Sequence, residues 1–148
     1  MTKSDIEVSI WIARSPEEIW DFLCDASNDV LWRYGIYLGQ WISEPPYGVG
    51  SNGFHIVSIW GDCPWIIAEW EELCIMSWDF TDGGFKGVRS GYRIAPEDTG
   101  SRVTMHTSVK SNAFMRIMVF LMKRFIRRNL AGDLERLKAI MEAQTPSN

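Results

Sequence analysis

The sequence predicts a single α+β domain in which a curved antiparallel sheet of about seven strands wraps around one long C-terminal helix. Three observations support this prediction. The 148 residues contain no Pro/Gly/Ser-rich linker and no internal repeat, which fits one hydrophobic core spanning residues 1–148. Short apolar segments separated by turn residues fill the middle of the chain. After Val109 the hydrophobic period changes from that of strands to that of a helix.

The N-terminal segment predicts one strand followed by two short helices. Apolar side chains alternate with others from Ile6 to Ile12, a period of two that is typical of a half-buried strand. The sequence Ser15-Pro16-Glu17-Glu18 then predicts a helix start, because serine can cap, proline suits the first helical position and Glu18 completes a capping box. A second short helix is expected over Ala26–Trp32.

Six further strands are expected between these helices and the C-terminal segment. They cover Ile36–Ser43, Asn52–Trp60, Trp65–Glu71, Leu73–Asp79, Lys86–Ala95 and Arg102–Val109. Glycine, proline and aspartate cluster in the segments that separate several of these strands. Because the connections are short, we expect the strands to pair in an antiparallel meander.

The C-terminal segment Phe114–Ala143 predicts one helix of about 30 residues, roughly 45 Å long. Leu130, Leu134, Leu137 and Met141 recur at helical spacing, and the polar side is assigned to Asp133, Glu135, Arg136 and Lys138. Upstream the segment is apolar nearly all round, so we expect other elements to enclose the N-terminal half of this helix. The helix is long enough to cover one face of the sheet.

Composition and charge exclude several classes of function. The net charge of −4 and the pI near 5.2 leave no surplus of lysine and arginine for a nucleic-acid backbone, so nucleic acid is not an expected partner. Three cysteines without a CxxC pair predict neither a disulfide framework nor a zinc site, and they fit reduced thiols in the cytoplasm. No signal peptide or transmembrane segment is predicted, and neither a metal nor another cofactor is expected.

Several local patterns together resemble the START and birch-pollen-allergen (SRPBCC) superfamily, and within it the polyketide cyclase/dehydrase and lipid-transport group. The order of elements matches this family's helix-grip fold over nearly the whole chain. The matching segments are Val8-Ser9-Ile10, Ser15–Asp21, Asp25 with Trp32, Gly48–Ser51, Glu69–Glu71 leading into Met76–Trp78, Thr99–Thr104 and Asp133–Lys138. One departure is the pair Glu72-Leu73, where the family often has two prolines at the central hairpin turn.

The resemblance implies a cavity between sheet and long helix that holds hydrophobic or amphipathic molecules. A total of 8 Trp and 7 Met in so short a chain fits this, since a solid core of this size has little room for eight indoles. From strand parity we expect one shared cavity bordered by Trp60, Trp78, Phe80, Tyr92, Met105, Met118 and Met122. Of these, Tyr92 is the best inward polar group, while a core tyrosine without a ligand role is the competing interpretation.

Residues for acid–base chemistry are less well defined. Parity places His106 on a polar face with Arg102 and Thr104, so we expect it to point to solvent. Parity does not decide the direction of His55, Glu69 and Asp79. If this protein is an enzyme and its active site is the cavity, the candidates for proton transfer are Tyr92, Glu69 and His55.

Two groups of side chains on the long helix can each be interpreted in two ways. A compact basic cluster, Lys123, Arg124, Arg127 and Arg128, is either a solvated helix face or a contact with an anionic membrane surface. Met115, Met118 and Met122 form a thioether stripe that packs a core or lines a cavity.

Three function classes remain open. The first is the binding or carriage of a lipid, isoprenoid, quinone or polycyclic aromatic molecule. The second is a cyclase or dehydratase acting on a ligand in the same cavity. The third is a protein-interaction module. The oligomeric state, the ligand and the pathway are not determined by the sequence.

Overall fold

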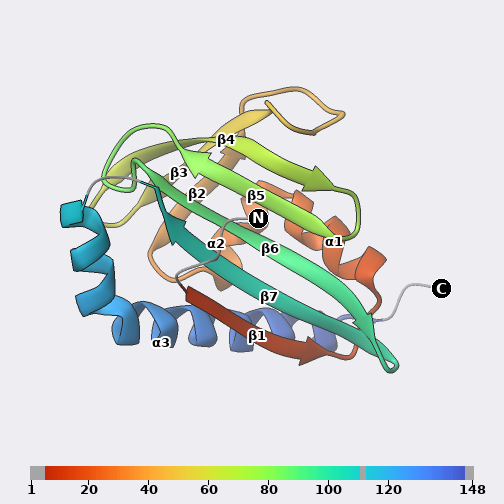
Figure 1. Cartoon of the computed structure of the whole chain (residues 1–148). Helices are drawn as coiled ribbons and strands as arrows, with labels where there is room; N and C mark the ends of the chain where they lie inside the picture. The colour runs from red at the N-terminus through yellow and green to blue at the C-terminus, as the bar shows by residue number, and fades with distance from the viewer. Residues whose placement is uncertain (1–5, 111–112, 146–148) are drawn as a thin grey trace.

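The computed structural model describes residues 6–110 and 113–145 and has the predicted architecture (Figure 1). Seven antiparallel strands form one sheet in the order β1-β7-β6-β5-β4-β3-β2. The elements in chain order are β1 (Ile6–Ile12), α1 (Pro16–Cys24), the 3-10 helix η1 (Ala26–Asn28), α2 (Asp29–Trp32), β2 (Ile36–Trp41), β3 (Asn52–Val57), β4 (Gly61–Glu71), β5 (Ile75–Phe80), β6 (Val88–Glu97), β7 (Gly100–Val109) and α3 (Ala113–Ala143). The curled sheet, the two short N-terminal helices and the long last helix confirm the helix-grip-like fold.

The start of α1 has the predicted capping box. The hydroxyl of Ser15 accepts a hydrogen bond from the backbone N–H of Glu18, whose carboxylate accepts one from the backbone N–H of Ser15. Pro16 occupies the first helical position. The helix buries Ile19, Trp20 and Leu23 toward the sheet. The second predicted helix is interrupted, because Ala26–Asn28 form a 3-10 turn before α2.

The strand boundaries differ from the prediction around Trp60. β3 ends at Val57 rather than at Trp60, and β4 begins at Gly61 rather than at Trp65. Gly61 has a positive φ of 66°, a conformation that favours glycine and that turns the chain directly after Trp60. Trp60 therefore lies in a turn, with half of its surface exposed, and packs beside Phe85 at a ring distance of 5.9 Å.

The expectation for α3 is only half confirmed. Its second half buries Leu130, Leu134, Leu137 and Met141, as predicted, and packs along β1. Its first half is not enclosed, and most of its large apolar side chains are exposed. In Figure 1 the first turns of α3 stand at a steep angle to the rest of the helix. The helix contacts β1, β7 and α2, whereas aromatic side chains fill the inner face of the sheet farther along.

The core lies between the inner face of the sheet and the helices. Its buried residues include five of the larger side chains of the molecule in one neighbourhood: Trp32, Trp65, Trp78, Tyr92 and Met105. This core is where the aromatic content of the chain is concentrated, and a small cavity lies within it.

Candidate functional site

A cavity of about 20 Å³ lies between the inner face of the sheet and the short helices. It is lined by residues from α1, η1, α2 and the strands β2 to β6, namely Leu23, Ala26, Asp29, Trp41, His55, Trp65, Ile67, Met76, Trp78 and Tyr92. The volume accommodates about one water molecule. A larger guest therefore requires side chains to move.

Aromatic rings form most of the cavity wall. The ring of Trp78 lies edge-on to Tyr92 at 5.0 Å, and Trp65 lies edge-on to Trp41 at the same distance. Trp65 and Trp78 are 6.4 Å apart. Such tilted and edge-to-face pairs contribute about 0.5–1.5 kcal/mol each beyond their burial. The wall is thus a set of mutually supporting rings.

Trp41 lines the cavity on the side of β2, and other residues hold its ring in place. Trp41 is half-buried, and its indole N–H donates to the backbone carbonyl of Cys24 at 2.8 Å. Tyr47, from the loop between β2 and β3, stacks flat on Trp41 with a ring distance of 3.8 Å and an interplanar angle of 7°. Trp41 is therefore held from both sides, by α1 and by this loop.

A buried acid–histidine pair lies at the cavity. Nε2 of His55 is 2.7 Å from Oδ2 of Asp29, and both side chains are almost fully buried. The backbone of η1, directly before α2, lies close to the sheet here because β2 has a glycine opposite it. A Cβ at Gly39 would lie 2.3 Å from the carbonyl oxygen of Ala26 and 3.1 Å from the ring of His55.

A second polar group adjoins the first. Arg33 donates from Nη1 to the hydroxyl of Tyr92 at 3.1 Å, and its Nε lies 3.4 Å from Oδ2 of Asp133 on α3. Asp133 also accepts hydrogen bonds from the backbone N–H of Tyr34 at 3.0 Å and from Arg136. The carboxylate of Asp133 therefore connects α3 to the segment that follows α2.

Burial and charge set the protonation of this group. Burial opposes the charge of Arg33, but the neighbouring Tyr92, Asp29 and Asp133 outweigh it and raise the pKa of the guanidinium. Burial raises the pKa of Tyr92 well above its usual value, and the Asp29 carboxylate adds to that effect. Tyr92 is consequently a neutral phenol at physiological pH, able to donate a hydrogen bond.

Four polar atoms at the cavity have no hydrogen-bond partner among the described residues. They are Nδ1 of His55, Oδ1 of Asp29 and the indole nitrogens of Trp65 and Trp78. Buried polar groups are nearly always paired, because leaving one unpaired costs about 1–3 kcal/mol. This concentration of unpaired donors and acceptors in one apolar wall is suited to a guest that carries its own polar atoms.

Comparison with known families decides the classification. The family model described as polyketide cyclase / dehydrase and lipid transport matches residues 3–142. The chain belongs to this family. No curated protein matches the sequence.

Solved structures similar to this family member share the fold at low sequence identity. The TTHA0849 protein of Thermus thermophilus has a TM-score of 0.70 and 15% identity, over 93% of this chain and 97% of that chain. The Aha1 dimer from Colwellia psychrerythraea has a TM-score of 0.65 and 17% identity, over 93% and 96%. Ara h 8.0201 has a TM-score of 0.67 and 14% identity, over 94% and 97%.

The structure brings two of the seven predicted site residues to the cavity. Trp78 and Tyr92 line it. Phe80 and Met105 are buried in the surrounding core. The other three lie at the surface instead of at a shared cavity: Trp60 is 50% exposed, Met118 38% and Met122 43%. Trp60 is displaced by the turn at Gly61, and the two methionines lie on the unenclosed half of α3.

Sequence reasoning did not identify Asp29, Trp41 and Trp65 as residues of this cavity, nor Arg33 and Asp133 as the polar group beside Tyr92. Asp133 was assigned to the polar side of the last helix, which is wrong. It lies three residues after Leu130 and four before Leu137, the spacing of one helix face, and this carboxylate is buried with them. That spacing is a signal available in the sequence. Asp29 has no such signal, because its helix is only four residues long.

The outer face of the sheet carries a separate group of charged side chains. Arg89 binds Asp79 at 2.7 Å and 2.8 Å and Glu69 at 3.2 Å, so both acids face away from the cavity. The expectation that His106 points to solvent is wrong, since only 6% of its surface is exposed. Charged side chains of other strands, Arg93 first among them, act on the imidazole electrostatically.

Neither a metal centre nor a membrane span emerges from residues 6–110 and 113–145. Within these ranges no group of three or more His, Cys, Asp or Glu residues lies close enough to hold a metal ion. No helix in the same ranges combines the length and the apolar character that crossing a bilayer requires.

Proposed function

We propose that this family member binds a hydrophobic small molecule and carries it in the cell. The cavity proposed for it lies between the sheet and the short helices α1, η1 and α2, and not against the long C-terminal helix as the resemblance implied. The observation that supports this function most strongly is the aromatic wall with its four unpaired polar atoms. Membership of a family described by lipid transport and polyketide chemistry supports the same function. Guests of the expected classes are a lipid, an isoprenoid, a quinone or a polycyclic aromatic molecule.

The wall chemistry favours a planar guest with oxygen atoms. Flat apolar molecules gain burial at about 25 cal/mol per Å² and stack on indole rings. The indole N–H groups of Trp65 and Trp78 are donors that suit a carbonyl oxygen, and Tyr92 is a third donor. A quinone or an oxygenated polycyclic ring therefore fits this wall better than a saturated chain.

Entry of such a guest requires the cavity to widen. Trp41 lines it on the side of β2 and is held by the hydrogen bond to Cys24, by the stack of Tyr47 and by edge-on contacts with Trp65 and Trp70. Displacing Trp41 and Tyr47 opens the wall without breaking a strand ladder. We propose this as the route by which the ligand enters.

The direct experiment is native mass spectrometry of freshly purified protein, followed by extraction of any bound molecule. The proposal expects a mass increment that organic solvent removes, and saturable binding of the neutral fluorophore N-phenyl-1-naphthylamine. Binding should weaken in Trp78→Ala and remain unchanged in Ile59→Ala, a matched truncation of an exposed side chain. A protein that binds no lipophilic probe would contradict carriage.

A second candidate function is catalysis on the bound ligand, of the cyclase or dehydratase kind. The observation favouring it is the His55–Asp29 pair at the cavity, in which the carboxylate orients the ring and Nδ1 has no partner among the described residues. A histidine held in this way is suited to remove a proton from a carbon atom beside a carbonyl group.

The experiment for this second candidate measures deuterium uptake by 2-tetralone in D₂O. Catalysis predicts faster exchange that His55→Gln abolishes while probe binding persists, and exchange at the uncatalysed rate would eliminate this candidate.

The state of the cysteines supports a location in the cytoplasm. Cys24, Cys63 and Cys74 are free thiols, as suits the reducing cytoplasm. Burial raises the pKa of the Cys24 thiol to about 12, with the neighbouring Asp21 adding to the effect. This thiol therefore stays protonated and unreactive.

A further inference from the structure

The first half of α3 exposes a continuous apolar stripe. Phe114, Ile117, Leu121 and Phe125 are spaced three or four residues apart, which places them on one side of the helix. Their exposed fractions are 72%, 57%, 71% and 56%. Phe120, which is 74% exposed, widens the apolar surface to one side. Contiguous exposed apolar surface of this kind marks an interaction site.

The same helical segment is strongly basic in a chain that is acidic overall. From residue 110 to residue 132 the sequence has six lysines and arginines and no acidic residue, whereas the whole chain has a net charge of −4. Five of these cations lie on the first half of α3 and are exposed: Arg116, Lys123, Arg124, Arg127 and Arg128. A partner of this surface must therefore be both apolar and negatively charged.

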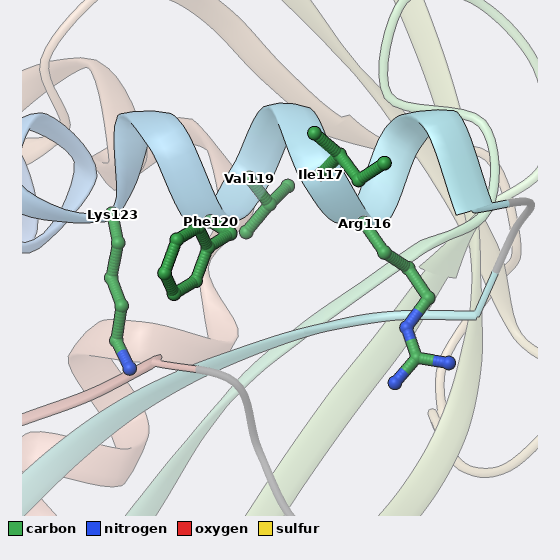
Figure 2. Close-up of a pocket in the computed structure, with 5 residues that line it drawn as sticks. All are labelled: Arg116, Ile117, Val119, Phe120 and Lys123. Atoms are coloured by element: carbon green, nitrogen blue, oxygen red, sulfur yellow. The ribbon is translucent and has the colours of Figure 1, made fainter.

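A surface groove runs beside this segment and combines both properties. It has a volume of about 330 Å³ and is lined by Arg116, Ile117, Val119, Phe120 and Lys123. In Figure 2 the side chains of Arg116 and Lys123 point to the same side of α3, with Val119 and Phe120 between them. The arrangement places two cations at the ends of an apolar strip.

We propose that the first half of α3 docks on the surface of an anionic phospholipid bilayer. The apolar stripe enters the boundary between headgroups and acyl chains, and the cations contact lipid phosphates and carboxylates. The segment lies on the surface, because no helix of the described ranges is suited to span the bilayer. A second copy of the chain is a poorer occupant, since a symmetric contact would bring two basic stripes together.

This inference concerns a different surface from the ligand cavity and does not depend on the proposed function. Docking would bring the protein to the phase in which a lipophilic ligand resides. The two proposals fail separately, because vesicle binding is measured without a ligand and probe binding without vesicles.

The experiment is flotation of the full chain with phosphatidylcholine vesicles that contain or lack phosphatidylserine. We expect flotation with the phosphatidylserine vesicles alone, and release when the salt concentration is raised. Removing one cation with Arg124→Gln should lower the partition coefficient about fivefold. Arg102→Gln removes one charge near the start of β7, outside the first half of α3, and should leave partitioning unchanged.

Apolar insertion is tested separately with Leu121→Ser, which should lower partitioning roughly tenfold. Val49→Ser alters an equally exposed apolar side chain in the loop between β2 and β3 and is the matched control. Thermal melting of each variant should stay close to that of the parent protein, because Arg124, Leu121 and Val49 are exposed and Arg102 is part of a half-exposed ion pair with Glu97. The absence of flotation, or equal flotation with both vesicle compositions, would overturn the proposal. So would light scattering that shows a dimer which Leu121→Ser converts to a monomer without any vesicle binding.

Discussion

Nε2 of His55 on β3 lies 2.7 Å from Oδ2 of Asp29 on α2, and both groups are buried beside the cavity. The pair joins a very short helix to the sheet at a point where Gly39 permits close approach. A buried pair of this kind adds little to the net free energy of folding, because the cost of desolvating both groups offsets much of their attraction. Its main effect is to hold the two elements in one relative position. The pair is therefore an anchor for α2 and an element of the proposed site.

Breaking the pair should destabilise the fold measurably. Asp29→Ala leaves His55 buried without its partner and should lower the free energy of unfolding by about 1–3 kcal/mol. Urea denaturation measures this change. In a double-mutant cycle with His55→Ala, the two losses should be less than additive, because each variant removes the same contact. Strict additivity would show that the residues are not coupled.

The close approach of η1 to β2 predicts the cost of a methyl group at Gly39. A Cβ there would lie 2.3 Å from a backbone oxygen of Ala26, so Gly39→Ala must push the two elements apart. We expect a loss of about 1–3 kcal/mol in the free energy of unfolding. Gly48→Ala, whose Cβ would have no atom within 4 Å, should be nearly neutral in the same denaturation experiment. Equal effects in the two variants would contradict the described approach.

The burial of His106 predicts a pH dependence of stability. Burial lowers the pKa of His106, and the guanidinium of Arg93 lowers it further, while Glu69 and Glu7 oppose this change. The unfolded chain therefore binds a proton at this residue more readily than the folded chain, beginning near the ordinary histidine pKa of 6.5. The contribution of His106 to stability is present above that pH and is lost as the pH falls below it.

Denaturation at several pH values between neutrality and mild acid measures this dependence. His106→Gln should reduce the decline in the free energy of unfolding below the ordinary pKa of histidine. An unchanged slope in the variant would show that the imidazole is accessible to solvent in the folded state.

The stack of Tyr47 on Trp41 predicts the rate of ligand entry. Tyr47→Ala removes a contact of about 0.5–1.5 kcal/mol from the closed wall, and should accelerate association of N-phenyl-1-naphthylamine roughly two- to tenfold. Tyr37→Ala truncates a tyrosine on β2 that is largely exposed and should leave the rate unchanged. Stopped-flow fluorescence measures both rates. Equal association rates in the parent and in Tyr47→Ala would place the entrance elsewhere.

Local patterns predicted the elements of this fold well, because they depend on near neighbours in the chain. The capping box of Ser15 and Glu18 is an example, as is the inward direction of Tyr92 on a strand with clear alternation. His106 shows the limit of the method. Strand parity assigned it to the face opposite Val103 and Met105, but parity does not reveal that only 6% of its surface is exposed there.

The site was harder to predict because its residues come from separate elements. Asp29, His55 and Tyr92 meet only after α2, β3 and β6 have packed, and no sequence spacing connects them. The prediction that other elements enclose the first half of α3 was wrong for another reason. An apolar segment favours burial, but the inner face of the sheet is already filled by rings such as Trp65 and Trp78, and α3 packs along β1 instead.

The most direct test of ligand binding in this cavity is the response of individual indole N–H signals in a ¹H–¹⁵N correlation spectrum. Titration with N-phenyl-1-naphthylamine should shift the signals of Trp65 and Trp78, whose indole nitrogens lie at the cavity unpaired among the described residues. The signal of Trp60, which lies in the exposed turn before β4, should stay in place. Assignment by single Trp→Phe variants identifies each signal. If the probe binds and moves only Trp60, or moves neither Trp65 nor Trp78, the cavity is not the ligand site.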